Sequence, residues 1–99
     1  MRIVLASLLA VWLPIAAVAA DRSQATAAVS DAVGAEAAAA RLGNRWVPTE
    51  AALKAARAAL AAQSWDIAVT QAARARLLAE RAVAQSNEQK TAWHDAVIR

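Results

Sequence analysis

Small apolar residues recur at helical spacing through the last third of the chain. Alanine occupies positions 68, 72, 75, 79 and 82, so these side chains share one face of a helix. Alanine has the highest helix propensity, and a stripe of such small side chains lets a second helix approach closely. The pattern predicts a helix from Trp65 to about Gln89, with Ser64 as its N-terminal cap.

A stripe with larger apolar residues precedes this one. It contains Leu53, Ala56 and Leu60, on a segment with a cap at Thr49. The short break before Trp65 predicts an antiparallel hairpin over residues 49–90, with the leucines in the alanine groove and Trp65 at the turn. An aromatic residue after a turn, followed by small residues one and two helical turns later, resembles the second helix of a tetratricopeptide repeat, so we expect a TPR-like hairpin.

A weaker apolar face precedes the hairpin. It consists of Val29, Val33 and alanines, after a cap at Ser23 and before a helix stop at Gly43-Asn44. We therefore expect an all-α fold, in which a long N-terminal helix is followed by the hairpin. The single small helical domain spans residues 21–99, divided into the N-terminal helix at 21–43, the hairpin at 49–90 and a tail at 91–99.

The first twenty residues have the pattern of a secretory signal peptide. Arg2 is followed by an uncharged stretch from Ile3 to Ala20, which ends in small residues. We expect cleavage after Ala19 or Ala20 and a periplasmic location, with no stable membrane insertion after cleavage. The alternative is an uncleaved anchor, since 18 uncharged residues are near the lower length limit for crossing a bilayer.

Composition and charge argue against catalysis and nucleic-acid binding. The chain has no cysteine and one histidine, His94, so thiolate metal sites and a c-type haem attachment are excluded. Lys and Arg are interspersed with Asp and Glu and form no basic stripe, which nucleic acid would require. We expect a protein that is not an enzyme and needs no cofactor or metal.

Three tryptophans follow the first twenty residues and are candidate contacts for a protein partner. Trp46 lies in a break that contains proline, Trp65 at the hairpin turn and Trp93 near the chain end. Trp and Arg are enriched in binding hot spots. Arg74 and Arg81 are seven residues apart and share a helix face, so we expect them to steer a partner by charge while the tryptophans anchor it. For Trp65, packing in the core is the main interpretation, and for Trp93 packing back onto the hairpin is the alternative.

The order of features from Arg45 to Lys90 resembles the SoxXA-binding protein (SoxK) family. It is carried by Arg45-Trp46 with Thr49, Leu53 and Ala56, a short turn with an aromatic at Gln63-Ser64-Trp65, the alanines at 68, 72 and 75, then Glu80, Gln85 and Gln89-Lys90. The chain departs from the family in having Gln63-Ser64 where Gly-Asp is usual and Val83 where an aromatic is expected. The resemblance implies a small periplasmic accessory protein that binds the SoxXA c-type cytochrome of thiosulfate oxidation and enhances its activity.

Two other functions fit the same residues. An alanine-rich helical protein of the envelope could be structural or homo-oligomeric, because a domain this small buries little apolar surface by itself. A membrane-surface helix is the second alternative, although the small apolar face of the first helical segment disfavours insertion.

Overall fold

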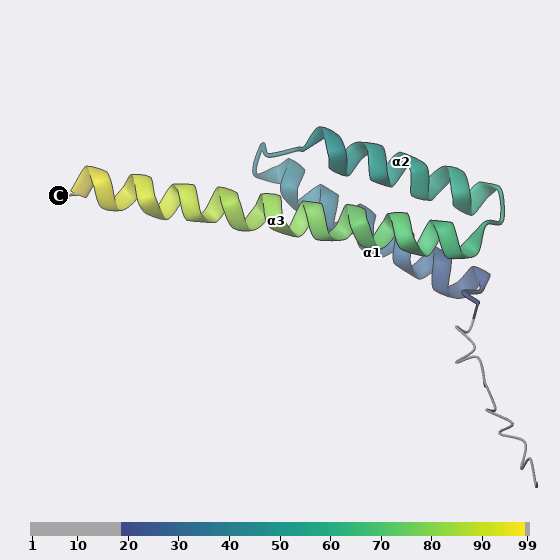
Figure 1. The fold of residues 1–99 in the computed structure, drawn as a ribbon. Helices are drawn as coiled ribbons and strands as arrows, with labels where there is room; N and C mark the ends of the chain where they lie inside the picture. The colour runs from purple at the N-terminus through teal and green to yellow at the C-terminus, as the bar shows by residue number, and fades with distance from the viewer. Residues whose placement is uncertain (1–18, 99) are drawn as a thin grey trace, which may run out of the picture.

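The chain folds into three helices joined by short connections (Figure 1). In the computed structural model, residues 19–98 are described; they form α1 (Arg22–Arg41), α2 (Val47–Ala61) and α3 (Trp65–Ile98). The described residues contain no strand, so the predicted all-α fold is confirmed. Most of the predicted signal peptide lies outside the described residues.

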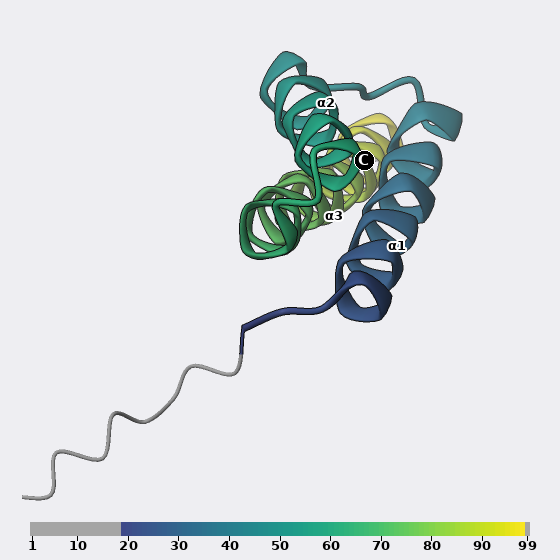
Figure 2. The same ribbon diagram turned by 90° about the vertical axis from the view of Figure 1, so that its right-hand side faces the viewer.

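Helix α3 is the axis of the molecule, because both other helices pack along it and contact each other less (Figures 1 and 2). In Figure 1 the chain runs along α1 toward the end where α2 begins, returns along α2, and then runs along α3. The specific likeness to a tetratricopeptide hairpin stays a prediction.

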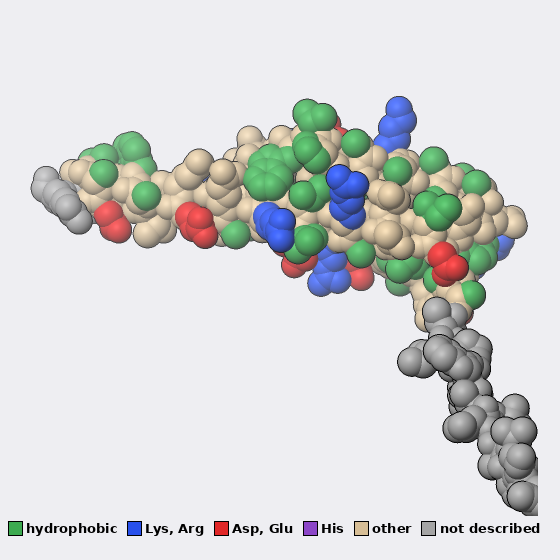
Figure 3. Space-filling model, viewed as in Figure 1, with side chains coloured by type: hydrophobic (Ala, Val, Ile, Leu, Met, Phe, Trp, Pro, Cys, Tyr) green, Lys and Arg blue, Asp and Glu red, His purple; other side chains and the backbone are tan. Residues whose placement is uncertain are grey.

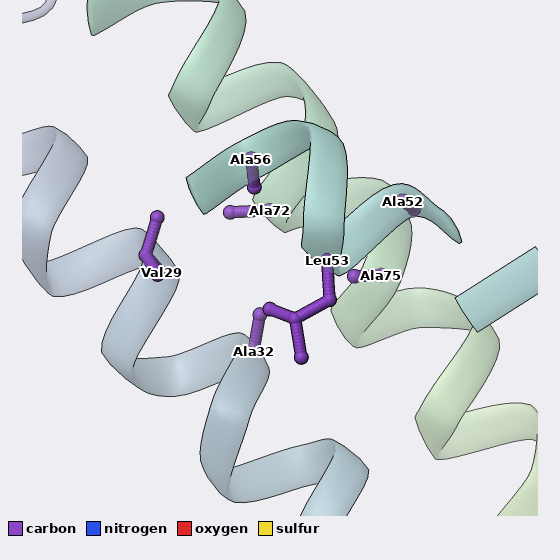
Figure 4. Close-up of a cluster of buried hydrophobic side chains, with 7 residues drawn as sticks. All are labelled: Val29, Ala32, Ala52, Leu53, Ala56, Ala72 and Ala75. Carbon is purple, nitrogen blue, oxygen red and sulfur yellow. The ribbon is translucent and has the colours of Figure 1, made fainter. Parts of the chain in front are cut away.

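The core is built almost entirely from alanine. The five alanines of the predicted α3 stripe are fully buried, and alanines of α1 and α2 face them. Leu53 projects from α2 toward Ala32 of α1 and belongs to one buried cluster with Ala72 and Ala75 of α3 (Figure 4). Among the described residues no large side chain is completely buried. Methyl-sized side chains bring the helix backbones close together, so packing depends on a narrow seam.

The packed face of α1 differs from the predicted one. Val29 is buried as expected, but Ala25, Ala32 and Ala39 complete the face, and Val33 is only partly buried. The alanine-rich segment offers small residues on several sides, so periodicity alone selects no single face. The closest fit to α3 decides which methyl groups are covered.

Two predicted helix caps were wrong. Asp21, and not Ser23, caps α1: its carboxylate accepts from the Gln24 backbone N–H at 2.8 Å, and the Gln24 side chain accepts from the Asp21 N–H at 3.0 Å. Helix α2 begins at Val47, before the predicted cap Thr49. Pro48 occupies the second helical position, where no intrahelical N–H bond is required.

The breaks between the helices are where the sequence places them. Gly43 has φ 68°, and the Asn44 N–H donates to the Ala39 carbonyl at 3.0 Å, which ends α1. At the second break Gln63 has φ 61°, and the Ser64 N–H donates to the Ala59 carbonyl at 2.9 Å. Both turns use the left-handed conformation to satisfy the last carbonyls of a helix.

Helix α3 continues beyond the predicted end at Gln89. It runs to Ile98, so the segment 91–99 predicted as a tail is helical as far as it is described. No glycine or proline interrupts the sequence after Pro48, and nothing in residues 87–98 stops the helix. This end of α3 extends beyond α1 and α2 (Figure 1).

Candidate docking surface

The packed face of α3 continues past the point where its partners end. The buried alanines are followed by Ser86, which is 9% exposed, and then by Gln89, Trp93 and Val97 at the same helical spacing. Every described side chain from 87 to 97 is exposed. The same side of α3 is therefore covered by α1 and α2 up to Ser86 and bare beyond it. We call residues 87–97 the α3 extension.

The bare face carries the large apolar side chains that the core lacks. Trp93 is 68% exposed and Val97 is 59% exposed. Hydrophobic side chains are visible near the C-terminal end of α3 in Figure 3. A shallow depression of about 430 Å³ lies at the base of this face; it is lined by Ser86, Gln89, Lys90, Trp93 and His94. Trp93 supplies the apolar part of this lining, and the other four residues are polar or charged.

The connection between α1 and α2 lies against α3 just before the bare face begins. The Asn44 Nδ2 amide donates to the Ala82 carbonyl at 2.8 Å, and the Trp46 indole N–H donates to Asn44 Oδ1 at 3.1 Å. Trp46 is partly buried, whereas its neighbour Val47 is 77% exposed. Ala82 and Trp93 are eleven residues apart, about 16 Å along the helix. Trp46 therefore lies where the packed body ends, near the middle of α3, and Trp93 lies about 16 Å farther along the helix.

Trp65 lies at the opposite end of α3. It is partly buried against Ala25, Ala59 and Ala68, and the Arg22 guanidinium lies 5.3 Å from the centre of its ring. Trp65 and Trp93 are 28 residues apart on one helix, about 42 Å. The structure does not bring the three predicted tryptophans together, and Trp65 closes the turn end of the core.

Arg74 and Arg81 are exposed on a different side of α3 from Trp93. At 100° per residue, Arg81 lies about 120° around the helix from Trp93, and Arg74 about 100°. Among the described residues neither guanidinium lies within 4.0 Å of an acidic group. The two arginines can contribute a long-range positive field, but they do not share the apolar face.

Several of the remaining charged residues form ion pairs. Arg45 lies 3.5 Å from Glu36, Arg76 lies 3.3 Å from Glu80, and His94 lies 3.9 Å from Asp95. In the part of the chain that the structure describes, no group of three His, Asp or Glu residues could hold a metal ion. The Arg76–Glu80 and His94–Asp95 pairs are exposed and contribute little to stability, whereas Glu36 is mostly buried.

Sequence reasoning missed two parts of this surface. It did not assign a role to Val47 or to the Asn44 bridge, because both depend on where the α1–α2 connection lies in space. The bare face of α3 could have been found by extending the alanine register, since steps of three and four residues lead from Ala82 through Ser86 and Gln89 to Trp93.

No helix in residues 19–98 combines the length and the apolar character that crossing a membrane demands. Comparisons of the chain with protein-family models, with curated proteins and with solved structures found no match.

Proposed function

We propose that this chain is a periplasmic accessory protein that docks on a c-type cytochrome of the SoxXA kind and enhances its activity. The likeness of residues 45–90 to SoxXA-binding proteins supplies the partner. The bare apolar face of the α3 extension is the single observation that carries a docking role.

An apolar helix face that is exposed to water is unfavourable in free energy. The 11-residue α3 extension has no tertiary contacts among the described residues, and a helix of that length is marginally stable in water by itself. The exposed Trp93 and Val97 add apolar surface that water disfavours. The same face is packed from Ala68 to Ser86. A partner that covers residues 89–97 would extend that packing and make the extension rigid.

Trp46 and Val47 offer a second contact to the same partner, about 16 Å along α3 from Trp93. Trp46 is held by the Asn44 bridge, so its ring is positioned before a partner arrives. Pre-positioned aromatic side chains lose little conformational entropy on binding. In this proposal Trp93 and Trp46 anchor the cytochrome, Arg74 and Arg81 steer it, and Trp65 stabilises the fold.

Co-purification from the periplasm tests the proposal. A C-terminally tagged full chain is expressed in a thiosulfate-oxidising bacterium, and the haem absorbance of the eluate is measured. We expect haem to co-elute with the natural chain and to be lost with Val97→Asp, which places a charge on the bare face. Ala84→Asp is the matched control, because Ala84 is exposed on another side of α3.

Two results would contradict the proposal. One is an eluate without haem under thiosulfate growth, and the other is equal haem with both variants. Recovery of untagged copies of the same chain without haem would instead support the alternative of a homo-oligomeric helical envelope protein, for which the same bare face is available.

A further inference from the structure

The backbone nitrogen of Ala20 is hydrogen-bonded to a carboxylate 46 positions away in the chain. It donates to Asp66 Oδ1 at 2.7 Å, which ties the residue before the N-cap of α1 to the first turn of α3. Within the described residues, no Lys, Arg or His side chain lies within 4.0 Å of the Asp66 carboxylate. The carboxylate thus has an amide donor and no cation.

The bond that signal-peptide processing would break is adjacent to this nitrogen. Residues 17–19 are Ala-Val-Ala, and residues 18–20 are Val-Ala-Ala, so the sequence permits cleavage after Ala19 or after Ala20. We infer that processing occurs between Ala19 and Ala20 and that the new amino terminus pairs with Asp66. The inference rests on the export that the proposed function requires.

The chemistry of this step is simple hydrolysis by an envelope signal peptidase. Water adds across the peptide bond, leaving a carboxylate on Ala19 and an ammonium on Ala20. The nitrogen that donated to Asp66 as an amide then carries a positive charge at the same place. A neutral hydrogen bond becomes a charge-assisted one, which is stronger.

Cleavage one residue later would have the opposite effect. The nitrogen of Asp21 takes part in the capping box of α1, where it donates to the Gln24 side chain at 3.0 Å. An ammonium there would put a positive charge on the N-terminal end of the helix, which the helix dipole disfavours. It would also remove Ala20 and leave Asp66 without its donor. Retaining Ala20 moves the charge off the helix end and onto Asp66.

The first measurement identifies the amino terminus. The full chain is exported in a Gram-negative host, and the mature protein is analysed by intact mass and N-terminal sequencing. We expect Ala20 as the first residue. A chain that begins at Asp21 or elsewhere, or that retains residue 1, overturns the inference whether or not a cytochrome co-purifies.

The second measurement tests whether the charge of Asp66 stabilises the protein through the Ala20 ammonium. Asp66→Asn keeps an acceptor oxygen but removes the negative charge, and we expect it to lower Tm by about 1–5 °C at low salt. Glu88→Gln is the control, because it removes an exposed carboxylate of the same helix. Insertion of Ser-Gly between Ala19 and Ala20 moves the ammonium two residues away while keeping the Ala20 N–H.

The insertion separates the ion pair from the other effects of Asp66. This carboxylate also favours α3 through the helix dipole, and that contribution is the same with and without the insertion. The Tm loss caused by Asp66→Asn is expected to fall by at least half in the inserted chain and in 1 M salt. An equal loss in both chains would show that the ammonium does not pair with Asp66.

Discussion

At the scale of single residues, the close packing of the three helices depends on the small volume of the alanine side chain. The α3 alanines are completely buried, and Leu53 is the one large side chain that projects into the main cluster. Burial of a leucine side chain contributes about 1.5–3 kcal/mol, whereas each methyl group contributes much less. A seam of this kind leaves the larger apolar side chains at its edges, where a partner can reach them.

Thr49 is the least satisfied residue of the seam. Its side chain is buried, and its hydroxyl has no hydrogen-bond partner among residues 19–98. We expect Thr49→Val to raise the free energy of unfolding by about 1 kcal/mol, because valine keeps the shape and removes the unpaired hydroxyl. Urea unfolding followed by circular dichroism measures the change.

The exposed Thr70 supplies a control for that substitution. Its hydroxyl donates to the Asp66 carbonyl within the same helix at 2.9 Å. Because this hydroxyl already has a partner, Thr70→Val is not expected to raise the free energy of unfolding. A Thr49→Val protein that is less stable than the natural one would mean that this hydroxyl has a partner in solution.

At the scale of helices, the features that depend on hydrophobic periodicity and on helix-breaking residues could be predicted from the sequence. The α3 stripe, the position of Leu53 and the stop at Gly43 all follow from local patterns, and the structure confirms them. The caps of α1 and α2 were wrong because a neighbouring Asp and a Pro at the second position outweighed the nearest Ser or Thr. The face of α1 could not be predicted, since it is chosen by packing among near-equivalent alanines.

The α3 extension should be the least protected part of the helix in the isolated protein. Backbone amides of residues 90–98 are expected to exchange with solvent at least about 100-fold faster than those of residues 72–82, because no tertiary contact holds them. Hydrogen exchange read by NMR measures both segments in one sample. Uniform protection through Val97 would mean that the face is covered, as in the homo-oligomeric alternative.

At the scale of the whole molecule, the predicted site divides into parts with different roles. Trp46 lies where the packed body ends, Trp93 lies farther along α3, Trp65 closes the other end of the body, and Arg74 and Arg81 lie on a separate flank. The sequence could nominate these residues by type, but it could not show that about 42 Å separates two of them, since that follows from α3 being one continuous helix. The docking proposal therefore rests on the bare face of α3 and on the α1–α2 connection.

The affinity of the mature protein for purified SoxXA cytochrome, measured by calorimetric titration, tests this account most directly. Trp93→Ala is expected to weaken binding by about 30-fold, the loss typical of a hot-spot tryptophan, without changing helicity. Leu77 is 50% exposed on another side of α3, and Leu77→Ala should leave the Kd within about twofold of the natural value. Equal affinities for the natural chain and Trp93→Ala, or no binding by either, would contradict the account.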